Sequence, residues 1–487
     1  MSELTLAQHI GRFAASSTFD TLPDDVVESV RKRVLDILGL CIAAAPLSTS
    51  RAARRFAEEQ GSQGQSHAVG VPARIAAPLA AFVNGVLAHS LDYDDTHLPS
   101  VLHPSASVIP AALATAEHAG ADGRATIAAI ACGLEVCVRV GMAGYDEGAA
   151  NSIFFEHGQH ATSICGTLGA AVSAALLYGL DADGVTNALG VAASMASGIL
   201  EANRTGGTVK RMHCGWAAHA GVTAAQLVRH GFTGAPTVLE GRFGFFQAWL
   251  HGRFDAAQIT EGLGEKWSVP GIFFKPYPAN HFTHAGIDAA LALRSRGVRA
   301  EDVESLRLGV ALPTVRTIGE PIEVKRAPET GYMAQFSGPY TVVAALLGGG
   351  GLGLGLDDFT DELARDPRRR ELMARVEVVA DERCNRIFPY QFPAVLRARL
   401  HDGRELEEEV LVNRGGPQRP LSVEELGTKF TDNAGRLLPP DTVAQIRENT
   451  LRLADLPRVS PLLEPLCNVD RRDAEANSTA SDEEKPS

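Results

Sequence analysis

Residues 23–41, PDDVVESVRKRVLDILGLC, decide the fold class of the chain. Pro23 followed by two acidic residues favours the first turn of a helix, because proline needs no amide partner there and negative charge is stabilised at a helix N-terminus. Apolar side chains then recur at steps of three and four, the spacing of one helix face: Val26, Val27, Val30, Val34, Ile37, Leu38 and Cys41. The stretch therefore predicts a helix with one buried stripe.

Segments rich in alanine and glycine come later and are also predicted to be helices. They span residues 125–140, 161–180, 185–198 and 217–230. Small side chains let helices approach closely, and strand-like alternation is nearly absent before residue 300. Residues 1–270 therefore predict a compact helical domain.

The pattern changes after residue 300. Residues 303–310, 376–379 and 395–400 are typical of strands. Asp402-Gly403 then leads into residues 405–412, which predicts a hairpin. We expect an α+β lid domain over residues 271–412.

The chain is then expected to return to the helical domain. Ser422 and Glu425 have capping-box spacing and predict a helix start, and residues 413–465 are assigned to this return segment. Residues 466–487 are expected to form a disordered tail, because residues 471–487 are polar and lack apolar anchors. The predicted fold is mainly α: a large all-helical domain formed by both chain ends, plus a smaller inserted α+β domain.

Composition excludes several classes of function. The chain has 487 residues, with 45 Lys and Arg against 58 Asp and Glu, and a net charge of −13. Nucleic-acid binding needs clustered basic residues, and here they are scattered, so a small-molecule partner is favoured. No secretory signal is visible, which predicts a cytoplasmic protein. Two runs without charged residues, 157–180 and 330–356, are interpreted as buried segments rather than membrane spans.

The cysteines and a glycine tract suggest no further site. The seven cysteines contain no C-x-x-C pair and are expected to be reduced thiols. Glycines at 348–351, 353 and 355 resemble a phosphate loop, but no Gly-Lys-Ser/Thr follows them. A turn after a helix at residues 340–347 is the better interpretation.

The densest group of chemically active residues is His89-Ser-Leu-Asp92-Tyr-Asp94-Asp95-Thr96-His97, followed by His103-Pro104-Ser105. Three carboxylates and three imidazoles within fifteen positions can supply proton donors and acceptors. A single aspartate there is better explained as a helix cap. The group as a whole indicates a catalytic site.

Three further segments carry histidine and lysine just before apolar stretches. They are His157-Gly-Gln-His160, Lys210-Arg211-Met-His213 and Lys275-Pro-Tyr-Pro-Ala-Asn280-His281-Phe-Thr-His284. Lysines in an acidic protein suggest local sites for substrate carboxylates.

Two alternatives remain open at this point. Asp92-x-Asp94-Asp95-Thr96 matches the D-x-D-D-T box of class II terpene cyclases, although aromatic walls for a carbocation are scarce, with 6% aromatic residues and 3 Trp. His89, Asp92, His97 and His103 could also bind a divalent metal, although no recognised metal-ligand pairing supports this.

The motifs together resemble the MmgE/PrpD family, which includes 2-methylcitrate dehydratase, cis-aconitate decarboxylase and iminodisuccinate epimerase. Matching segments run in family order over residues 5–460; besides those above, they include Gln335-Phe-Ser-x-x-Tyr340, Pro420-Leu-Ser and Lys429-Phe430. The resemblance implies a large helical domain, a lid domain, a homodimer, and no metal or organic cofactor.

The resemblance also implies roles for individual residues. Asp92, Thr96, His103, His160, Lys210, Lys275 and Tyr340 fall on positions that line the active site in the decarboxylase branch. Lys210, Lys275 and Thr96 would bind carboxylates, and Asn280 and His281 are assigned to substrate binding as well. His103 is the first choice for proton transfer, with Asp92 orienting or tuning it, and His160 is the second; Tyr340 is counted as catalytic too. Lys210, Lys275, His103 and His160 are expected to meet in one cavity.

Some positions depart from the decarboxylase pattern. Asn280 stands where that branch has a histidine, five positions after Lys275, and the spacing from Asp92 to His103 is one residue longer. The Trp-containing insertion of methylcitrate dehydratases before His103 is missing.

The sequence therefore predicts a cytoplasmic lyase, a dehydratase or decarboxylase, that acts on a small di- or tricarboxylate without a metal or cofactor. No nucleic-acid or membrane partner is expected. An epimerase or racemase of an aspartate-like diacid such as iminodisuccinate is the first alternative. An inactive homologue with a binding role is the second.

Overall fold

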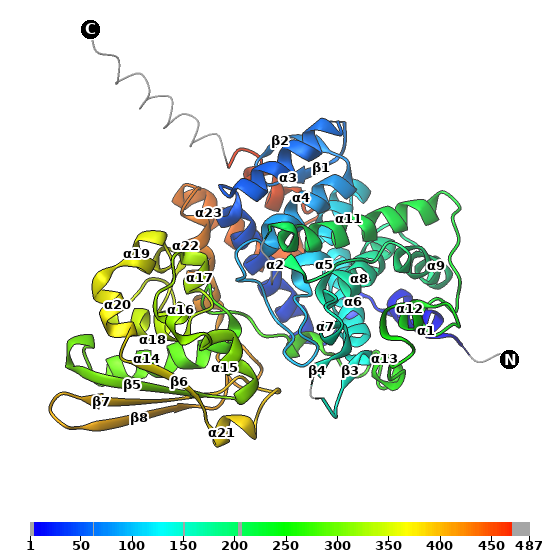
Figure 1. Ribbon diagram of the computed structural model, residues 1–487. Helices are drawn as coiled ribbons and strands as arrows, with labels where there is room; N and C mark the ends of the chain where they lie inside the picture. Colours follow the sequence, from blue (N-terminus) through cyan, green and yellow to red (C-terminus); the bar gives the residue numbers. More distant parts are fainter. Residues whose placement is uncertain (1–3, 62, 150, 203–206, 470–487) are drawn as a thin grey trace, which may run out of the picture. The chain divides into compact units, whose positions relative to one another are not determined.

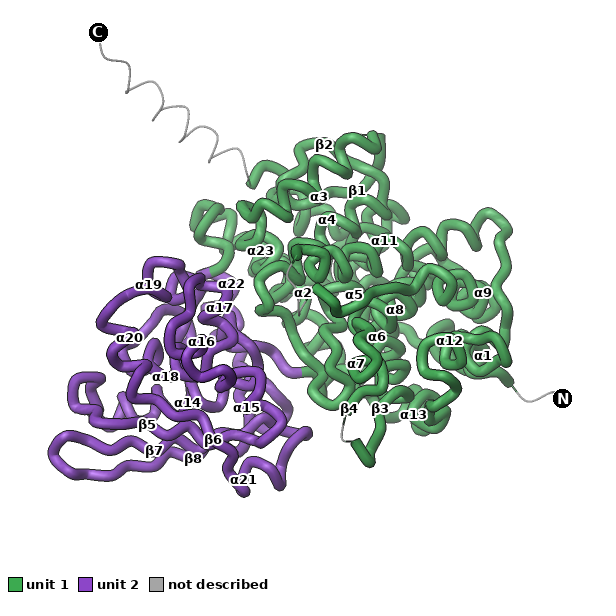
Figure 2. Tube along the Cα trace, viewed as in Figure 1, with its two compact units in different colours: residues 1–272, 433–487 green, residues 273–432 purple. Residues whose placement is uncertain are grey.

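The chain forms two compact units in a computed structural model that describes residues 4–61, 63–149, 151–202 and 207–469. Figure 2 shows them in two colours: unit 1 comprises residues 1–272 and 433–487, and unit 2 comprises residues 273–432. Unit 1 is mainly helical and unit 2 combines helices with a sheet. The predicted fold class, a helical domain from both chain ends with an inserted α+β domain, is confirmed.

The return to unit 1 comes later in the chain than the sequence suggested. The prediction began the return at residue 413, whereas the structure keeps residues 413–432 in unit 2. Leu421 and Leu426 pack there against Phe274 in a small apolar cluster. This apolar contact, which no short sequence pattern indicates, helps to keep residues 413–432 in unit 2.

The predicted capping box is confirmed. The Ser422 amide donates to Glu425 Oε2 at 2.8 Å, and the Glu425 amide donates to Ser422 Oγ at 3.1 Å. Helix α22 (Val423–Ala434) begins there, and α23 (Pro440–Leu451) packs against α2 in unit 1.

Residues 466–469, the first part of the predicted disordered tail, are part of unit 1. They are described and ordered in the structure, with Leu466 and Val469 buried. The Leu466 carbonyl accepts a hydrogen bond from the Gly70 amide. The rest of the predicted tail, residues 470–487, lies outside the described residues.

Six long helices form the core of unit 1 (Figure 1). They are α2 (Asp24–Ala44), α4 (Ala77–His89), α5 (Ser105–Ala119), α6 (Gly123–Ala143), α8 (Ala161–Leu177) and α11 (Val209–Arg229). Helix α2 begins directly after Pro23, as the opening stretch predicted, and its apolar stripe is buried. Helix α11 packs against α4 and α8, and α6 packs against α8.

Glycines let these helices touch. A Cβ added to Gly85 on α4 would lie 2.7 Å from the Gly215 Cα on α11, and one added to Gly133 on α6 would lie 2.6 Å from the Gly169 carbonyl oxygen on α8. Real Cβ atoms do not come that close to backbone atoms. The close packing expected from the small residues is thus present at both crossings.

Shorter elements complete unit 1. The helices are α1 (Leu6–Ser16), α3 (Ser48–Glu59), α7 (Ile153–Glu156), α9 (Ala182–Ala193), α12 (Phe245–Leu250), α13 (Ala257–Thr260) and α24 (Ser460–Leu463). The 3₁₀ turns are η1 (Phe19–Thr21), η2 (Val269–Gly271), η6 (Leu453–Asp455) and η7 (Glu464–Leu466). Two small antiparallel pairs are β1 (Ser66–Ala68) with β2 (Val71–Ile75) and β3 (Tyr145–Asp146) with β4 (Asn151–Ser152).

Unit 2 is built on a four-stranded sheet of order β6-β5-β7-β8. The strands are β5 (Val303–Val310), β6 (Val376–Ala380), β7 (Ala394–Leu400) and β8 (Glu405–Val410). Strand β5 pairs parallel with β6 and antiparallel with β7, and β7 and β8 form the hairpin predicted at Asp402-Gly403. All four predicted strands are present, although β8 ends two residues early.

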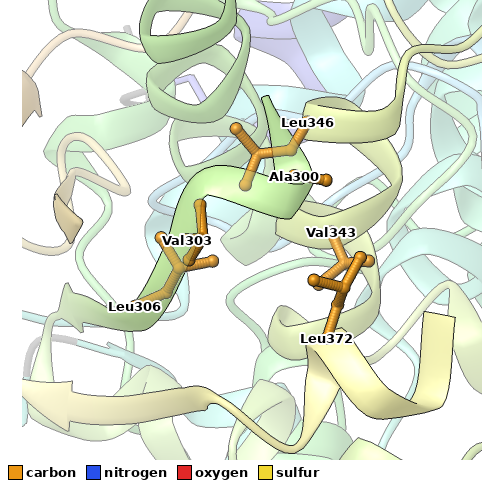
Figure 3. Close-up of a pocket in the computed structure, with 6 residues that line it drawn as sticks. All are labelled: Ala300, Val303, Leu306, Val343, Leu346 and Leu372. Atoms are coloured by element: carbon orange, nitrogen blue, oxygen red, sulfur yellow. The ribbon is translucent and has the colours of Figure 1, made fainter. Parts of the chain in front are cut away.

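Helices α14 (His284–Ser295) and α18 (Gly338–Leu347) cover one face of this sheet. Between sheet and helices lies the apolar core of unit 2. Figure 3 shows six of its side chains around a gap too narrow for a water molecule: Ala300, Val303, Leu306, Val343, Leu346 and Leu372. The smaller helical elements of unit 2 are α15 (Leu312–Ile318), α16 (Ile322–Arg326), α17 (Gly331–Ala334), α19 (Asp361–Arg365), α20 (Pro367–Met373), α21 (Glu382–Asn385), η3 (His281–Thr283), η4 (Ala300–Asp302) and η5 (Leu356–Asp358).

The glycine tract after α18 forms a turn whose backbone amides bond the carboxylate of Asp358. Asp358 Oδ2 accepts hydrogen bonds from the amides of Gly350 at 3.0 Å and Gly355 at 2.7 Å. Backbone amides that would cradle a phosphate are therefore already bound to a carboxylate. This agrees with the rejection of a phosphate loop.

The cysteines and the apolar helix α6 are largely buried inside the protein. All seven cysteines are free thiols and are buried. Among the described residues, α6 is long and apolar enough to cross a membrane, as is the bent pair α2 and α3 if counted as one span. Core helices meet the same criterion, and 89% of the apolar window of α6 is buried.

Candidate active site

The loop between α4 and α5 carries the densest group of polar residues, and a buried ion pair anchors it. Arg33 on α2 donates to Asp95 Oδ2 at 2.6 Å, and the two side chains are 1% and 2% exposed. The same guanidinium donates to the carbonyls of Val269 and Ile272, at 3.2 and 2.7 Å. The Ser105 hydroxyl, at the start of α5, also donates to Asp95. The loop is thus fixed at its centre to three parts of unit 1.

His103 is held in one orientation by this loop. Its Nδ1–H donates to the backbone carbonyl of Asp95 at 2.7 Å, and Thr96 Oγ1 lies 3.4 Å from the same nitrogen. The His103 amide donates to Thr162 on α8. A neutral imidazole that donates from Nδ1 carries its lone pair on Nε2. With its side chain 14% exposed, His103 is therefore arranged to accept a proton at Nε2.

His160 and His213 form a second imidazole pair. His160 is the N-cap residue of α8, and His213 lies in the second turn of α11. Their Nδ1 atoms are 2.9 Å apart, so one nitrogen donates and the other accepts. Ser163 on α8 donates to the His213 carbonyl and holds the two helices in register at this point. The packing of α8 against α11 thus brings together residues that are 53 positions apart.

His89 joins the two imidazole groups. It is the last residue of α4, and its ring centroid lies 5.3 Å from that of His103 and 5.6 Å from that of His160. Its Nδ1–H donates to Asp94 Oδ2 at 2.7 Å. Four imidazoles therefore lie in one continuous series, His103–His89–His160–His213.

The surroundings give these imidazoles different charges. Burial opposes protonation of His89, but the carboxylate of Asp94 together with the Cys214 side chain outweighs it and raises the pKa of His89 to about 10. Burial and then the positive charges of His89, Lys210 and other histidines hold the pKa of His160 well below its usual range. Burial, His89 and Lys210 lower the pKa of His213 to about 4. These directions favour an imidazolium at His89 and neutral rings at His160 and His213.

Lys210 and Asp92 border the same cluster. Lys210 Nζ lies 3.8 Å from Asp92 Oδ1, and the lysine side chain is 24% exposed. Asp92 has a φ of +52°, a left-handed backbone conformation that costs on the order of 1 kcal/mol for a residue other than glycine. Asp92 thus lies beside Lys210, and Asp94 Oδ2 lies 3.8 Å from His103 Nδ1. That Asp92 orients or tunes His103 stays a prediction.

The structure thus groups five of the sequence-predicted site residues in unit 1: Asp92, Thr96, His103, His160 and Lys210. The other four lie in unit 2: Lys275, Asn280, His281 and Tyr340. That residues of both units line one cavity stays a prediction.

The four predicted residues of unit 2 are placed as follows. Lys275 is 2% exposed, and His281 is buried beside His284, with ring centroids 4.6 Å apart. The Asn280 side chain caps η3 by accepting from the Phe282 amide.

Tyr340 lies on α18, in the apolar core of unit 2. Its hydroxyl donates to the Asp358 carbonyl at 2.5 Å and accepts from Arg369 at 3.2 Å. Burial raises the pKa of Tyr340 to about 12. Its catalytic role stays a prediction, and in this structure the hydroxyl holds α18 to the segment around Asp358.

Sequence reasoning assigned no role to several residues that shape the site. His89, Asp94, Asp95 and His213 stood in the quoted clusters, and Arg33 stood in the opening helix. A charged residue at position 33, between the apolar positions of the α2 stripe, was the available signal. Its full burial shows that it has a partner inside the protein, because an unpaired buried charge is very costly.

The geometry bears on both alternatives from the sequence. The second and third aspartates of the D-x-D-D-T box, Asp94 and Asp95, are engaged by His89 and Arg33 rather than presented as free acids. Of the four residues considered as metal ligands, His97 instead bonds Ser100 at 2.6 Å. Among the described residues, no group of three or more His, Cys, Asp or Glu side chains is arranged to hold a metal ion.

The fold and the site together define a class of protein: a helical unit with an inserted α+β unit, and a histidine cluster in the helical unit. Comparison of the sequence with known protein families identifies this class. The MmgE/PrpD N-terminal domain model matches residues 8–257, and the MmgE/PrpD C-terminal domain model matches residues 277–455. The chain belongs to the MmgE/PrpD family.

Curated relatives show which activities occur among similar proteins. The chain is 29% identical to the cis-aconitate decarboxylase of Homo sapiens over 478 residues, which cover 94% of each protein. It is 25% identical to the cis-aconitate decarboxylase of Aspergillus terreus, over 95% of this chain and 96% of that protein. A mitochondrial 2-methylcitrate dehydratase of Yarrowia lipolytica is 26% identical over 36% of this chain and 33% of its own length.

Proposed function

We propose that the protein is a lyase that acts on a small tricarboxylate, with decarboxylation of a cis-aconitate-like substrate as the reaction. The observation that carries the proposal is the series of four imidazoles beside Lys210, in which His103 Nδ1 bonds the Asp95 carbonyl and His89 Nδ1 bonds Asp94. Decarboxylation is preferred over dehydration because the decarboxylases match along nearly the whole chain, whereas the dehydratase matches about a third of it.

The proposed chemistry uses only side chains of the protein. Lys210 binds a substrate carboxylate by a charge-assisted hydrogen bond. When the C–C bond to the departing carboxylate breaks, carbon dioxide leaves and its electron pair remains on carbon. The positive charge of Lys210 stabilises that negative charge, and an imidazole, His103 or His160, delivers a proton to the carbon. Either imidazole must carry a proton beforehand to act as this acid.

The assignments in unit 2 belong to the same proposal. Lys275, Asn280 and His281 are proposed to bind substrate, and Tyr340 to be catalytic, on the basis of the family resemblance. We also propose, on that basis alone, that the enzyme is a cytoplasmic homodimer without a metal or organic cofactor. Light scattering of the purified protein tests the dimer, and activity after exhaustive chelation tests the metal.

One experiment separates the candidate reactions. Pure protein is incubated in D₂O with cis-aconitate, citrate, 2-methylcitrate or iminodisuccinate, and the products are read by proton NMR. The proposal predicts loss of carbon dioxide from cis-aconitate with one deuterium fixed on product carbon. Dehydration of 2-methylcitrate would contradict the decarboxylase assignment, and deuterium uptake into iminodisuccinate without net conversion would favour an epimerase. No reaction with any substrate would refute a lyase of this class.

Variants test the site itself. His103→Gln should lower kcat by about 10²-fold or more, because general acid–base catalysis contributes about 10²–10⁴-fold. His118→Gln is a matched control, since His118 bonds Tyr178 in unit 1 and has no part in the cluster. Equal activity of the two variants would show that the proton-transfer group has been misassigned.

A further inference from the structure

His89 is the most enclosed member of the histidine series. It lies between His103 and His160, its side chain is 1% exposed, and it bonds Asp94 at 2.7 Å. Neither the family resemblance nor the curated relatives assign it a function. Its position between the two candidate proton-transfer groups nevertheless places any charge on it within about 6 Å of both rings.

The charged and titratable groups around His89 come from four parts of unit 1. They are Asp94 and His103 from the loop, His160 from α8, Lys210, His213 and Cys214 from α11, and Cys41 from α2 beside Asp94. Asp94 supplies the negative charge that bonds directly to the ring. Lys210 adds positive charge on the side of His160 and His213.

We propose that the His89–Asp94 ion pair sets the protonation pattern of the site: His89 keeps a positive charge, and that charge holds His160 and His213 in the neutral form. His89 is thus a positioning residue that acts through its neighbours. This inference deepens the function proposed above, and its kinetic part rests on that function.

Electrostatics gives the size of the effect. A unit charge 5.6 Å from a second titratable ring, at an effective dielectric constant of about 20 to 40, changes its titration midpoint by about one to two pH units. The direction agrees with the lowered pKa values of His160 and His213, for which burial is the larger cause and His89 the next. The Nδ1–Nδ1 bond requires an acceptor nitrogen in one of the two rings, so it too disfavours protonation of both.

Loss of His89 should also change His103. Asp94 lies 3.8 Å from His103 Nδ1, and His89 now occupies the same Asp94 oxygen. With His89 replaced by glutamine, the full negative charge of Asp94 acts on His103, which favours the imidazolium. His160, His213 and His103 should therefore all titrate at higher pH.

The test uses the full-length protein labelled at the histidine ring carbons. Titration followed by NMR compares wild type with His89→Gln, and single-histidine variants assign the signals. We expect the midpoint of His160 to rise by about one to two pH units and that of His213 to rise as well. His97→Gln is the matched control, because His97 is buried in the same loop, bonds Ser100, and has a pKa lowered to about 4 by burial and Arg33. Midpoints that do not move in His89→Gln would overturn the proposal.

A second variant tests the proposal if His89→Gln does not fold. Asp94→Asn keeps the His89 ring but removes the charge that holds its proton, so His160 and His213 should again titrate at higher pH. Unmoved midpoints in a folded Asp94→Asn protein would count against the proposal in the same way.

Kinetics separates this inference from the proposed function. If the protein is a decarboxylase, the imidazole that delivers the proton must be protonated, so the alkaline limb of the pH dependence of kcat should move upward in His89→Gln by the amount seen in NMR, with a smaller change in KM. Shifted midpoints in a protein that turns over none of the four substrates would support the electrostatic role and reject the lyase. An unshifted pH profile in an active variant would overturn the role given to His89.

Discussion

The ion pair between Arg33 and Asp95 gives the sharpest prediction about stability. Asp95→Asn removes one charge and leaves the Arg33 guanidinium buried. The Coulomb attraction across 2.6 Å is on the order of 6 kcal/mol at an effective dielectric constant of 20. Asparagine can keep one hydrogen bond to the guanidinium, and breaking a buried pair typically costs about 3–5 kcal/mol. We expect a loss in that range.

Tryptophan fluorescence during urea unfolding is a suitable assay. All three tryptophans, at 216, 249 and 267, lie in unit 1, so their signal reports the unit that contains the pair. Asp20→Asn is the matched control, because Asp20 pairs with Arg124 at the surface, where such pairs contribute at most about 1 kcal/mol. If Asp95→Asn costs no more than Asp20→Asn, the anchoring role of the pair is refuted.

Three other predictions concern packing, pH and substrate binding. Gly133→Ala should destabilise unit 1 by about 1–3 kcal/mol, because its Cβ would collide with α8, whereas Gly271→Ala, with open space around it, should be nearly neutral in the same unfolding assay. The pKa of His89 rises from 6.5 to about 10 on folding, so its ion pair with Asp94 stabilises the folded protein fully below about pH 6.5 and no longer does so near pH 10. The difference in unfolding free energy between wild type and His89→Gln should therefore shrink from about pH 6.5 to about pH 10. A difference that stays constant over this range would contradict the ion pair. Lys210→Met should raise KM for cis-aconitate by about 10-fold or more through the lost charge-assisted bond, whereas Lys266→Met at the exposed surface should leave KM unchanged.

Local features of the fold could be predicted from the sequence. The start of α2 at Pro23, the capping box at Ser422 and Glu425 and the hairpin at Asp402-Gly403 are each encoded within a few residues. The point where the chain returns to unit 1 could not be predicted. It depends on Leu421 and Leu426 packing on Phe274, about 150 residues earlier, and no short-range pattern records such a contact.

The candidate site likewise has features that could be predicted from the sequence and features that could not. The His89–His103 stretch was identifiable because its chemistry is dense in the sequence. The meeting of His160 and His213 was not, because it depends on how closely α8 and α11 approach, and the charge of His89 depends on burial beside Asp94. The bond between Asp94 and His89 was equally hidden from the sequence, and the orienting or tuning role suggested for Asp92 stays a prediction.

The bond between the Nδ1 atoms of His160 and His213 has a stoichiometric consequence. One nitrogen must be bare for the bond to exist, so the two rings together can take up a single additional proton, and a second would drive them apart. The pair therefore behaves as a single base that takes up one proton. It can release that proton from the Nε2 atom of either ring. A proton taken up at one ring can thus be given back from the other without either side chain moving.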